Sequence, residues 1–211
     1  MYRDELFSAY RRHPWHGLEA LPKGEDAGIV QAYIEMLPSD TVKYELDKKT
    51  GFLVVDRPQR TSATPPALYG FIPRTYCAEE VAARCDHAEV GDGDPLDICI
   101  FSERLITRAD ILLNARVVGG IQMIDGGEAD DKIIAVLEGD NIWGGVEDLK
   151  DLPPIKTERL QHYFATYKMI PGKKVDIRVD CVYDRAEALK VIDAAILDYQ
   201  NHYGHLLQQA S

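Results

Sequence analysis

The sequence predicts an α+β fold that is mainly β, in which an antiparallel sheet or barrel is covered by helices near the C-terminus. Short apolar or alternating runs separated by turn residues indicate the strands. Apolar residues at three- and four-residue steps indicate helices after residue 154. The 211 residues, 45% of them hydrophobic, can bury one substantial core. We therefore expect a single domain over residues 1–211.

The first 28 residues are expected to form an N-terminal extension, in which Leu6, Phe7 and Tyr10 have the spacing of a short helix. Six strands are then expected, at residues 29–37, 42–46, 52–55, 96–101, 115–123 and 132–137. The clearest strand covers residues 175–183, because apolar and polar side chains alternate along it. Its buried face is expected to carry Val175, Ile177, Val179, Cys181 and Tyr183.

Two helices are expected in the last third of the chain. Pro154 is typical of a first helical position, and Leu160, Phe164 and Tyr167 follow it on one stripe. Asp184 with Glu187 resembles a capping box at the start of the second helix. That helix should pack on the sheet or barrel through a stripe of apolar residues at Leu189, Ile192, Ile196, Tyr199 and Tyr203.

Composition and charge exclude several classes of protein. A net charge of −11, from 24 basic and 35 acidic residues, opposes non-specific nucleic-acid binding, which needs a positive surface. No window approaches the roughly 18 consecutive apolar residues of a membrane span. Four cysteines are too few for a disulfide scaffold, and the N-terminus lacks the apolar stretch of a signal peptide. We expect a cytoplasmic protein without nucleic-acid or membrane partners.

The segment from Asp92 to Asp97, Asp-Gly-Asp-Pro-Leu-Asp, places three carboxylates within six residues. Such a cluster is costly unless cations offset the repulsion, and oxygen ligands select Mg²⁺, Ca²⁺ or Mn²⁺ over zinc. An EF-hand does not fit, because Leu96 stands at loop position 5 and Asp97 replaces the glycine of position 6. A solvated acidic turn is the remaining alternative.

Two further groups of charged residues could complete such a site. Asp125 to Lys132 is a second acidic segment, although a hairpin turn rich in Gly and Asp would explain the same residue types. Lys43, Arg57 and Lys168 are basic residues within or beside predicted strands and helices. Each could simply be solvated, but together with bound metal ions they suit a phosphate-rich substrate.

The order of these motifs is more specific than any one of them. It comprises Lys43-Tyr44-Glu45, Asp56-Arg57, Tyr69-Gly70-Phe71-Ile72-Pro73, the segment Asp92 to Asp97 followed by Ile98, Asp125 to Lys132, and Tyr167-Lys168. This order resembles that of the soluble family I inorganic pyrophosphatases, over roughly residues 29–200. The resemblance implies an OB-like five-stranded β-barrel with helices packed outside it.

The resemblance also implies an activity, the hydrolysis of pyrophosphate to two phosphates by in-line attack of a water activated by several Mg²⁺ ions. Asp94 would be the general base. The metal ligands would be Asp92, Asp97, Asp125 and Asp130. The phosphates would be bound by Lys43, Arg57, Tyr167 and Lys168. Residues supporting these would be Glu35, Glu45, Tyr69 and Lys132. Members of the family form hexamers or dimers, so a homo-oligomer is expected.

Two other functions stay open at this point. An OB-like barrel could bind nucleic acid or a phosphorylated ligand without catalysis, although the acidic balance opposes this. The chain could also hydrolyse a longer phosphoanhydride such as a nucleoside triphosphate or polyphosphate. No P-loop motif is present in the sequence, which weakens the nucleotide version.

The chain departs from the family pattern at three places. Pro65 stands where many members have a tyrosine, so that hydroxyl is absent, and Gly126 replaces a common acidic residue. Residues 73–91 are expected to be a loop insertion at a surface or interface. Cys77, Cys85 and His87, with Asp86, could suggest a partial zinc site there, but the spacing of a structural zinc site is missing.

Overall fold

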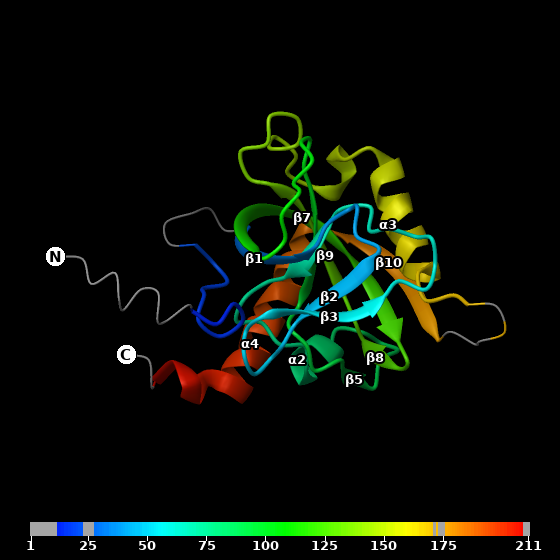
Figure 1. The fold of residues 1–211 in the computed structure, drawn as a ribbon. Helices are drawn as coiled ribbons and strands as arrows, with labels where there is room; N and C mark the ends of the chain where they lie inside the picture. The colour runs from blue at the N-terminus through cyan, green and yellow to red at the C-terminus, as the bar shows by residue number, and fades with distance from the viewer. Residues whose placement is uncertain (1–11, 23–27, 171, 173–175, 209–211) are drawn as a thin grey trace.

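The computed structural model describes residues 12–22, 28–170, 172 and 176–208. The helix expected around Leu6, Phe7 and Tyr10 lies outside the described residues, and so does Val175. A barrel of strands occupies the centre of the molecule, with helices on its outer surface (Figure 1). The expected α+β fold, mainly β, is confirmed.

Five strands pair into a closed ring, which confirms the expected OB-like barrel. They are β1 (Ile29–Met36), β4 (Leu68–Phe71), β6 (Asp97–Phe101), β9 (Lys132–Leu137) and β7 (Ile111–Asp125). The ring closes because β1 pairs with β7, from Ile29 opposite Arg116 to Ile34 opposite Ile111. The expectation of an antiparallel arrangement needs one correction, since β6 and β9 are parallel.

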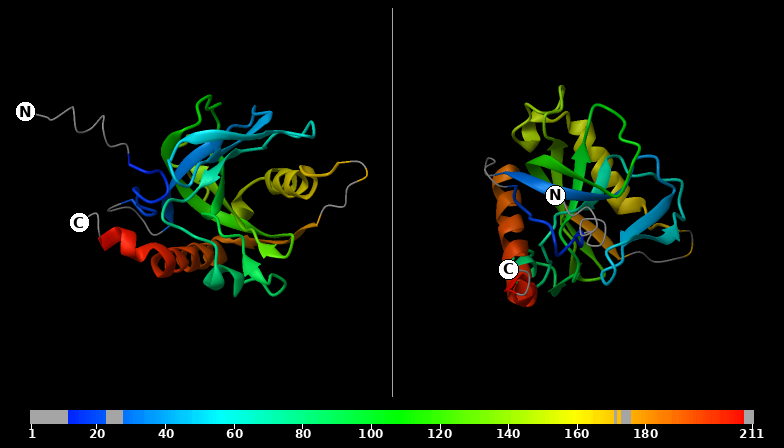
Figure 2. Two further views of the ribbon diagram at one scale, coloured as in Figure 1. Left: turned by 60° about the horizontal axis from the view of Figure 1, so that its bottom comes forward. Right: turned by 60° about the vertical axis from the view of Figure 1, so that its left-hand side comes forward.

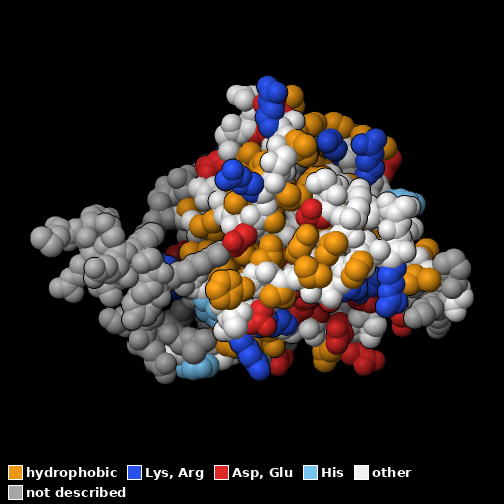
Figure 3. Space-filling model, in the orientation of Figure 1, with side chains coloured by type: hydrophobic (Ala, Val, Ile, Leu, Met, Phe, Trp, Pro, Cys, Tyr) orange, Lys and Arg blue, Asp and Glu red, His pale blue; other side chains and the backbone are white. Residues whose placement is uncertain are grey.

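The strands expected at residues 42–46 and 52–55 do not belong to this ring. As β2 (Val42–Leu46) and β3 (Leu53–Pro58) they form a separate two-stranded hairpin. Phe52, Val54 and Val55 are exposed there, on a face where Figure 3 shows hydrophobic side chains at the surface. Their place in the ring is taken by β4, whose four residues are too short a run for periodicity to predict.

A second correction concerns β10 (Ile177–Asp184), which pairs with the distal part of β7. Its pairing register shifts between Val179 and Cys181, as in a β-bulge. The side chains that follow the shift therefore point to the opposite face of the sheet from the one that strict alternation predicts. Ile177 and Val179 pack against one apolar cluster and Tyr183 against another. Cys181, expected on the buried face, is exposed. Two short strands, β5 (Val90–Gly91) and β8 (Glu128–Ala129), extend the sheet beyond β7.

Both expected helices are confirmed, and Figure 2 shows them on different sides of the barrel. α3 (Pro154–Thr166) has Pro154 in its first turn and follows a short 3-10 helix, η1 (Leu149–Asp151). α4 (Arg185–Gln208) packs on β7 and buries Ala188, Ile192 and Ala195 in the main core. Within the described residues, no helix combines the length and apolar character needed to cross a membrane.

The start of α4 shows half of the expected capping box. The Asp184 carboxylate accepts a hydrogen bond from the backbone N–H of Glu187 at 3.0 Å. The Glu187 carboxylate pairs instead with Arg84 and Lys190.

Residues 73–91 are more deeply integrated than a surface loop. They contain the short helix α2 (Glu79–Ala82), which packs against α4. Cys77, Val81 and Cys85 are buried in the same apolar cluster as the barrel strands. Because Asp86 and His87 are exposed while both cysteines are buried, these residues do not form the partial zinc site.

The described part of the N-terminal arm packs on the body of the protein. Trp15 is buried, and its indole N–H donates to the carbonyl of Thr75 at 2.8 Å. His16 stacks on Trp15 and lies 2.8 Å from the Tyr199 hydroxyl. Burial, with the charges of His13 and Arg74, lowers the pKa of His16 to about 4.

This lowered pKa predicts a contribution to acid sensitivity. The unfolded chain binds a proton at His16 near pH 6.5 and the folded chain near pH 4, so acidification through this window favours unfolding. We expect the urea midpoint to fall less between pH 6.5 and pH 4 in His16→Gln than in wild type. His162→Gln, at an exposed histidine of α3, is the control and should behave like wild type. Equal losses in all three proteins would contradict the prediction.

Candidate active site

The carboxylates that the sequence singles out meet in one cleft at an end of the barrel. Asp97 begins β6, Lys132 begins β9 beside it, and Asp125 ends the antiparallel β7. These positions fall at the same end of the ring because β6 and β9 are parallel to each other and β9 is antiparallel to β7. The predicted residues that line the cleft are Glu35, Lys43, Glu45, Tyr69, Asp92, Asp94, Asp97, Asp125, Asp130, Lys132, Tyr167 and Lys168.

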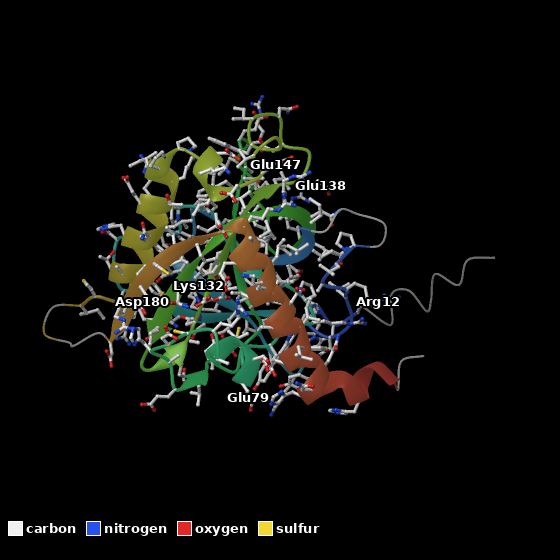
Figure 4. All side chains as sticks on the ribbon, turned by 180° about the vertical axis from the view of Figure 1, so that it is seen from behind. Arg12, Glu79, Lys132, Glu138, Glu147 and Asp180 are labelled. Atoms are coloured by element: carbon white, nitrogen blue, oxygen red, sulfur yellow. The ribbon has the colours of Figure 1, made fainter. Side chains whose placement is uncertain are left out.

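Lys132 is the buried cation of this cleft, with a side chain only 2% exposed. Its ammonium donates to Asp97 Oδ2 at 2.5 Å and to the Asp130 carboxylate. Figure 4 shows Lys132 near the middle of the molecule. Burial opposes the charge on Lys132, but the three carboxylates of Asp130, Asp97 and Asp92 outweigh it and raise its pKa well above the usual range. Lys132 therefore stays protonated.

The aspartates exceed the positive charge that faces them. Burial raises the pKa of Asp92, and the charge of Asp130 raises it further. The pKa of Asp130 is also raised, again mainly by burial. The Asp92 carboxylate accepts the N–H of Asp94 at 3.0 Å, which holds the acidic loop in a tight turn. These carboxyl groups resist ionisation beside one another, and a hard divalent cation bound by their oxygens would favour their charged forms.

Tyr69 and Glu35 support the metal-ligand candidates from neighbouring strands. The Tyr69 hydroxyl donates to Asp97 Oδ2 at 2.5 Å. Burial and the Asp97 charge raise the Tyr69 pKa well above its usual range, so the hydroxyl remains a donor. Glu35 accepts the N–H of Leu46 at 2.7 Å, and burial, with the charge of Asp97, raises its pKa to about 8. Tyr69 fixes one carboxylate, and Glu35 joins the barrel to the β2–β3 hairpin.

The second acidic segment is both a hairpin turn and part of the cleft. Asp125 pairs with Glu128 across Gly126 and Gly127, whose φ angles are 63° and 92°. Two central residues with positive φ are typical of the tightest hairpin turn, where a side chain other than glycine is strained. The missing acidic residue at position 126 thus accompanies a turn that favours glycine. Asp125 itself pairs with Lys168, which follows α3.

The positive side of the cleft comes largely from the β2–β3 hairpin. Lys43 lies 3.4 Å from both Glu45 and Asp56. Arg57 is opposite Lys43 in the hairpin register but does not line the cleft, and its guanidinium pairs with Asp56. It is close enough to α3 for its charge to act on Tyr163. Arg57 therefore borders the cleft beside Lys43.

Several lining residues are absent from the sequence-based predictions, among them Lys48 and Tyr163. Lys48, in the β2–β3 turn, pairs with the Asp94 carboxylate. Tyr163 is 7% exposed, and its ring stacks on Tyr167 with centroids 5.2 Å apart. Tyr163 lies one helical turn before Tyr167, a spacing that could have indicated it. Lys48 has no such local signal, because its role depends on the hairpin folding over the acidic loop.

The fold and the cleft together define a metal-dependent enzyme with anion-binding side chains opposite its acidic cluster. The sequence pattern of the inorganic pyrophosphatase family matches residues 32–200. The chain belongs to this family.

Relatives and solved structures agree with this assignment. The inorganic pyrophosphatase of Chlamydia muridarum is 48% identical over 199 residues, which cover 90% of this chain and 94% of that protein. Soluble inorganic pyrophosphatase 2 of Chlamydomonas reinhardtii is 37% identical over 191 residues, with 90% of each chain covered. The crystal structure of the Thermus thermophilus inorganic pyrophosphatase matches with a TM-score of 0.72 and 33% identity, covering 87% of this chain and 98% of that one.

The role of Lys132 in compensating the charge of Asp97 and Asp130 can be tested by measuring the free energy of unfolding. Lys132→Met leaves Asp97 and Asp130 buried without their cation, so we expect it to lose about 3–5 kcal/mol of stability at pH 8 in EDTA. A divalent cation bound by these carboxylates should recover part of this loss. Urea unfolding with EDTA and with Mg²⁺ measures both effects. Lys190→Met, on the exposed side of α4, should change stability by less than about 0.5 kcal/mol.

A Lys132→Met protein as stable as wild type in EDTA would contradict the assignment of Lys132 as the compensating charge.

Proposed function

We propose that this chain hydrolyses inorganic pyrophosphate to two orthophosphates. The observation that carries the proposal is the convergence of five aspartates with Lys43, Tyr167 and Lys168 in one cleft. A substrate made of two phosphates needs cations on one set of its oxygens and donors on the other. Membership of the inorganic pyrophosphatase family supports the same substrate.

The metal ligands that we propose are Asp92, Asp97, Asp130 and Asp125, and the ions are several Mg²⁺. These ligands are carboxylates only, which suits Mg²⁺ better than zinc or copper. When bound, such ions lower the pKa of a water and neutralise phosphate charge. Three residues support these ligands without binding the ions. Lys132 and Tyr69 hold the metal-ligand candidates in place by hydrogen bonds, and Glu35 joins the barrel to the hairpin.

Asp94 is the general base in our proposal. Its side chain lines the cleft and is 39% exposed, whereas that of Asp130 is only 13% exposed. It takes the proton of the attacking water while Lys43, Arg57, Tyr167 and Lys168 hold the phosphate oxygens in line with that water. Glu45 fixes Lys43, and Asp125 fixes Lys168. Lys48 pairs with the Asp94 carboxylate and orients it.

We propose that Tyr163 is a further phosphate-binding residue. Pro65 removes the tyrosine hydroxyl expected from that segment, and Pro65 and Tyr163 border the same second cavity beside α3. Tyr163 also lines the acidic cleft, next to Tyr167. It therefore stands between the altered segment and the proposed phosphate site.

We further propose that residues 1–211 form one domain, with 73–91 as an insertion, and that the protein is a cytoplasmic homo-oligomer. The burial of Trp15 against the body supports inclusion of the N-terminal arm. Location and assembly rest on the composition and on the family resemblance. A nucleic-acid-binding module is not favoured, because the cleft is lined by aspartates that repel phosphates unless metal ions are present.

Phosphate release from pyrophosphate, with and without Mg²⁺, tests the function and the two aspartate roles. Asp94→Asn should lose most turnover, at least about 100-fold for a general base, but retain metal binding. Asp97→Asn should lose turnover and also bind Mg²⁺ more weakly, as measured by calorimetry. A wild-type protein that released phosphate no faster than Asp97→Asn would overturn the proposal.

The role of Tyr163 predicts a specific kinetic change. Tyr163→Phe keeps the ring and its stack on Tyr167 but removes the hydroxyl, so we expect KM for pyrophosphate to rise about 10-fold with the loss of one charge-assisted hydrogen bond. Steady-state kinetics at saturating Mg²⁺ measures this. Tyr203→Phe, on α4 outside the cleft, is the matched control. An unchanged KM in Tyr163→Phe would remove Tyr163 from the substrate site.

A further inference from the structure

We propose that Asp198, on α4, is a positioning residue for the acidic loop Asp92–Asp97, acting through the segment Ile72–Val81. The inference rests on the proposed function only in treating that loop as the metal site. Asp198 is far from the loop in sequence and does not line the cleft. It is nevertheless a fully buried carboxylate, with an exposed fraction of 0%.

The Asp198 carboxylate binds the backbone of the segment that contains α2. Oδ2 accepts the N–H groups of Ala78 at 2.9 Å and Val81 at 3.1 Å, and Oδ1 accepts that of Glu80 at 3.0 Å. These N–H groups lie at the start of α2, where a helix has no internal acceptors for them. The three hydrogen bonds satisfy N–H groups that would otherwise be left without an acceptor. Asp198 thus fixes this segment on α4.

The same segment holds the acidic loop by its backbone. Cys77 donates its N–H to the carbonyl of Asp94 at 2.8 Å, and Gly93 donates its N–H to the carbonyl of Cys77 at 3.0 Å. The contact is close, because a Cβ at Gly91 would lie 2.3 Å from the carbonyl oxygen of Cys77. Cys77 immediately precedes Ala78, the first residue bound by Asp198. The residue that Asp198 binds, Ala78, and the residue that binds the acidic loop, Cys77, are therefore adjacent in the chain.

A second set of hydrogen bonds holds the other end of the loop. The Thr75 hydroxyl accepts the N–H of Leu96 at 2.9 Å and donates to the carbonyl of Ile72 at 2.6 Å. Ile72 in turn donates its N–H to the carbonyl of Leu96 at 3.0 Å. Tyr76, between the two sets, donates its N–H to the carbonyl of Ala195 on α4. The segment is thus fixed to α4 on one side and to the loop on the other.

A metal site at Asp198 is the alternative use of this carboxylate. Glu79, Asp198 and His202 have ligand atoms within 4.8 Å of one another, and Figure 4 labels Glu79 on α2. Both oxygens of Asp198, however, are engaged by backbone N–H groups. His202 lies 3.6 Å from Glu79 as a possible ion pair. The geometry therefore favours a structural link between α4 and the loop.

The test compares metal affinity in full-length variants, with Mn²⁺ binding followed by electron paramagnetic resonance and Mg²⁺ dependence followed by phosphate release. Asp198→Asn keeps the shape but replaces one acceptor oxygen by an NH₂ group that faces N–H donors. We expect Mn²⁺ affinity about 10-fold weaker and a matching rise in the Mg²⁺ concentration for half-maximal activity. KM for pyrophosphate at saturating Mg²⁺ should change less than about 2-fold.

Two variants on the same helix are controls. Asp193→Asn removes an exposed carboxylate of α4, and Val191→Ala weakens the core packing of α4 but removes no hydrogen bond to the segment Ile72–Val81. Both should bind Mn²⁺ like wild type. If Asp198→Asn does not fold, Thr75→Val, which removes the hydroxyl that supports Leu96, should show the weakened affinity instead.

Three outcomes would overturn the inference. The first is wild-type affinity in a folded Asp198→Asn or, where that variant does not fold, in Thr75→Val. The second is a loss of affinity in Val191→Ala equal to that in Asp198→Asn, which would assign the effect to stability alone. The third is a wild-type protein that binds no divalent ion, which would overturn the proposed function as well.

Discussion

The buried ammonium of Lys132 is the interaction on which the cleft depends. Asp97 and Asp130 could not lie side by side in a low-dielectric interior without a cation between them. Lys132 reaches them because its strand, β9, runs parallel to β6, with Lys132 directly beside Asp97. The one parallel pair of the barrel therefore determines where the carboxylates can be placed. A divalent cation could then favour the charged forms of Asp92 and Asp130, whose pKa values are raised.

Different parts of the fold supply the acidic and the basic side of the cleft. The metal-ligand candidates are held by the closed barrel and its tight turns, and Asp97 and Asp130 accept hydrogen bonds from the buried Lys132. Lys43 and Arg57 come from a two-stranded hairpin with exposed apolar residues, and Lys168 follows the end of α3. Acidic residues fixed by the barrel, with basic residues from the hairpin and the end of α3, suit a site that keeps its proposed metal ligands in place while substrate enters and product leaves.

The sequence predicted what is local and missed what depends on pairing. The segment from Asp92 to Asp97 could be recognised because its carboxylates are adjacent in the chain, and the long helices because their apolar stripes repeat. β4 was not predicted because a run of four residues is too short to show a period. Cys181 was placed on the wrong face because the position of a bulge depends on the partner strand. Lys48, Tyr163 and Asp198 acquire their neighbours only in the tertiary structure, so no local spacing marks Lys48 or Asp198.

The closure of the ring by β1 and β7 also has a consequence for how the protein is made. Residues near position 30 must wait for residues near position 115 before they can pair, and such non-local contacts form late in folding. On the ribosome, Asp92, Asp94 and Asp97 emerge before Asp130 and Lys132, and α4 emerges last of the described elements. The nascent chain thus exposes its acidic loop without the lysine that compensates it or the helix that fixes it. The proposed metal ligands can therefore come together around Lys132 only after β9 has been synthesised.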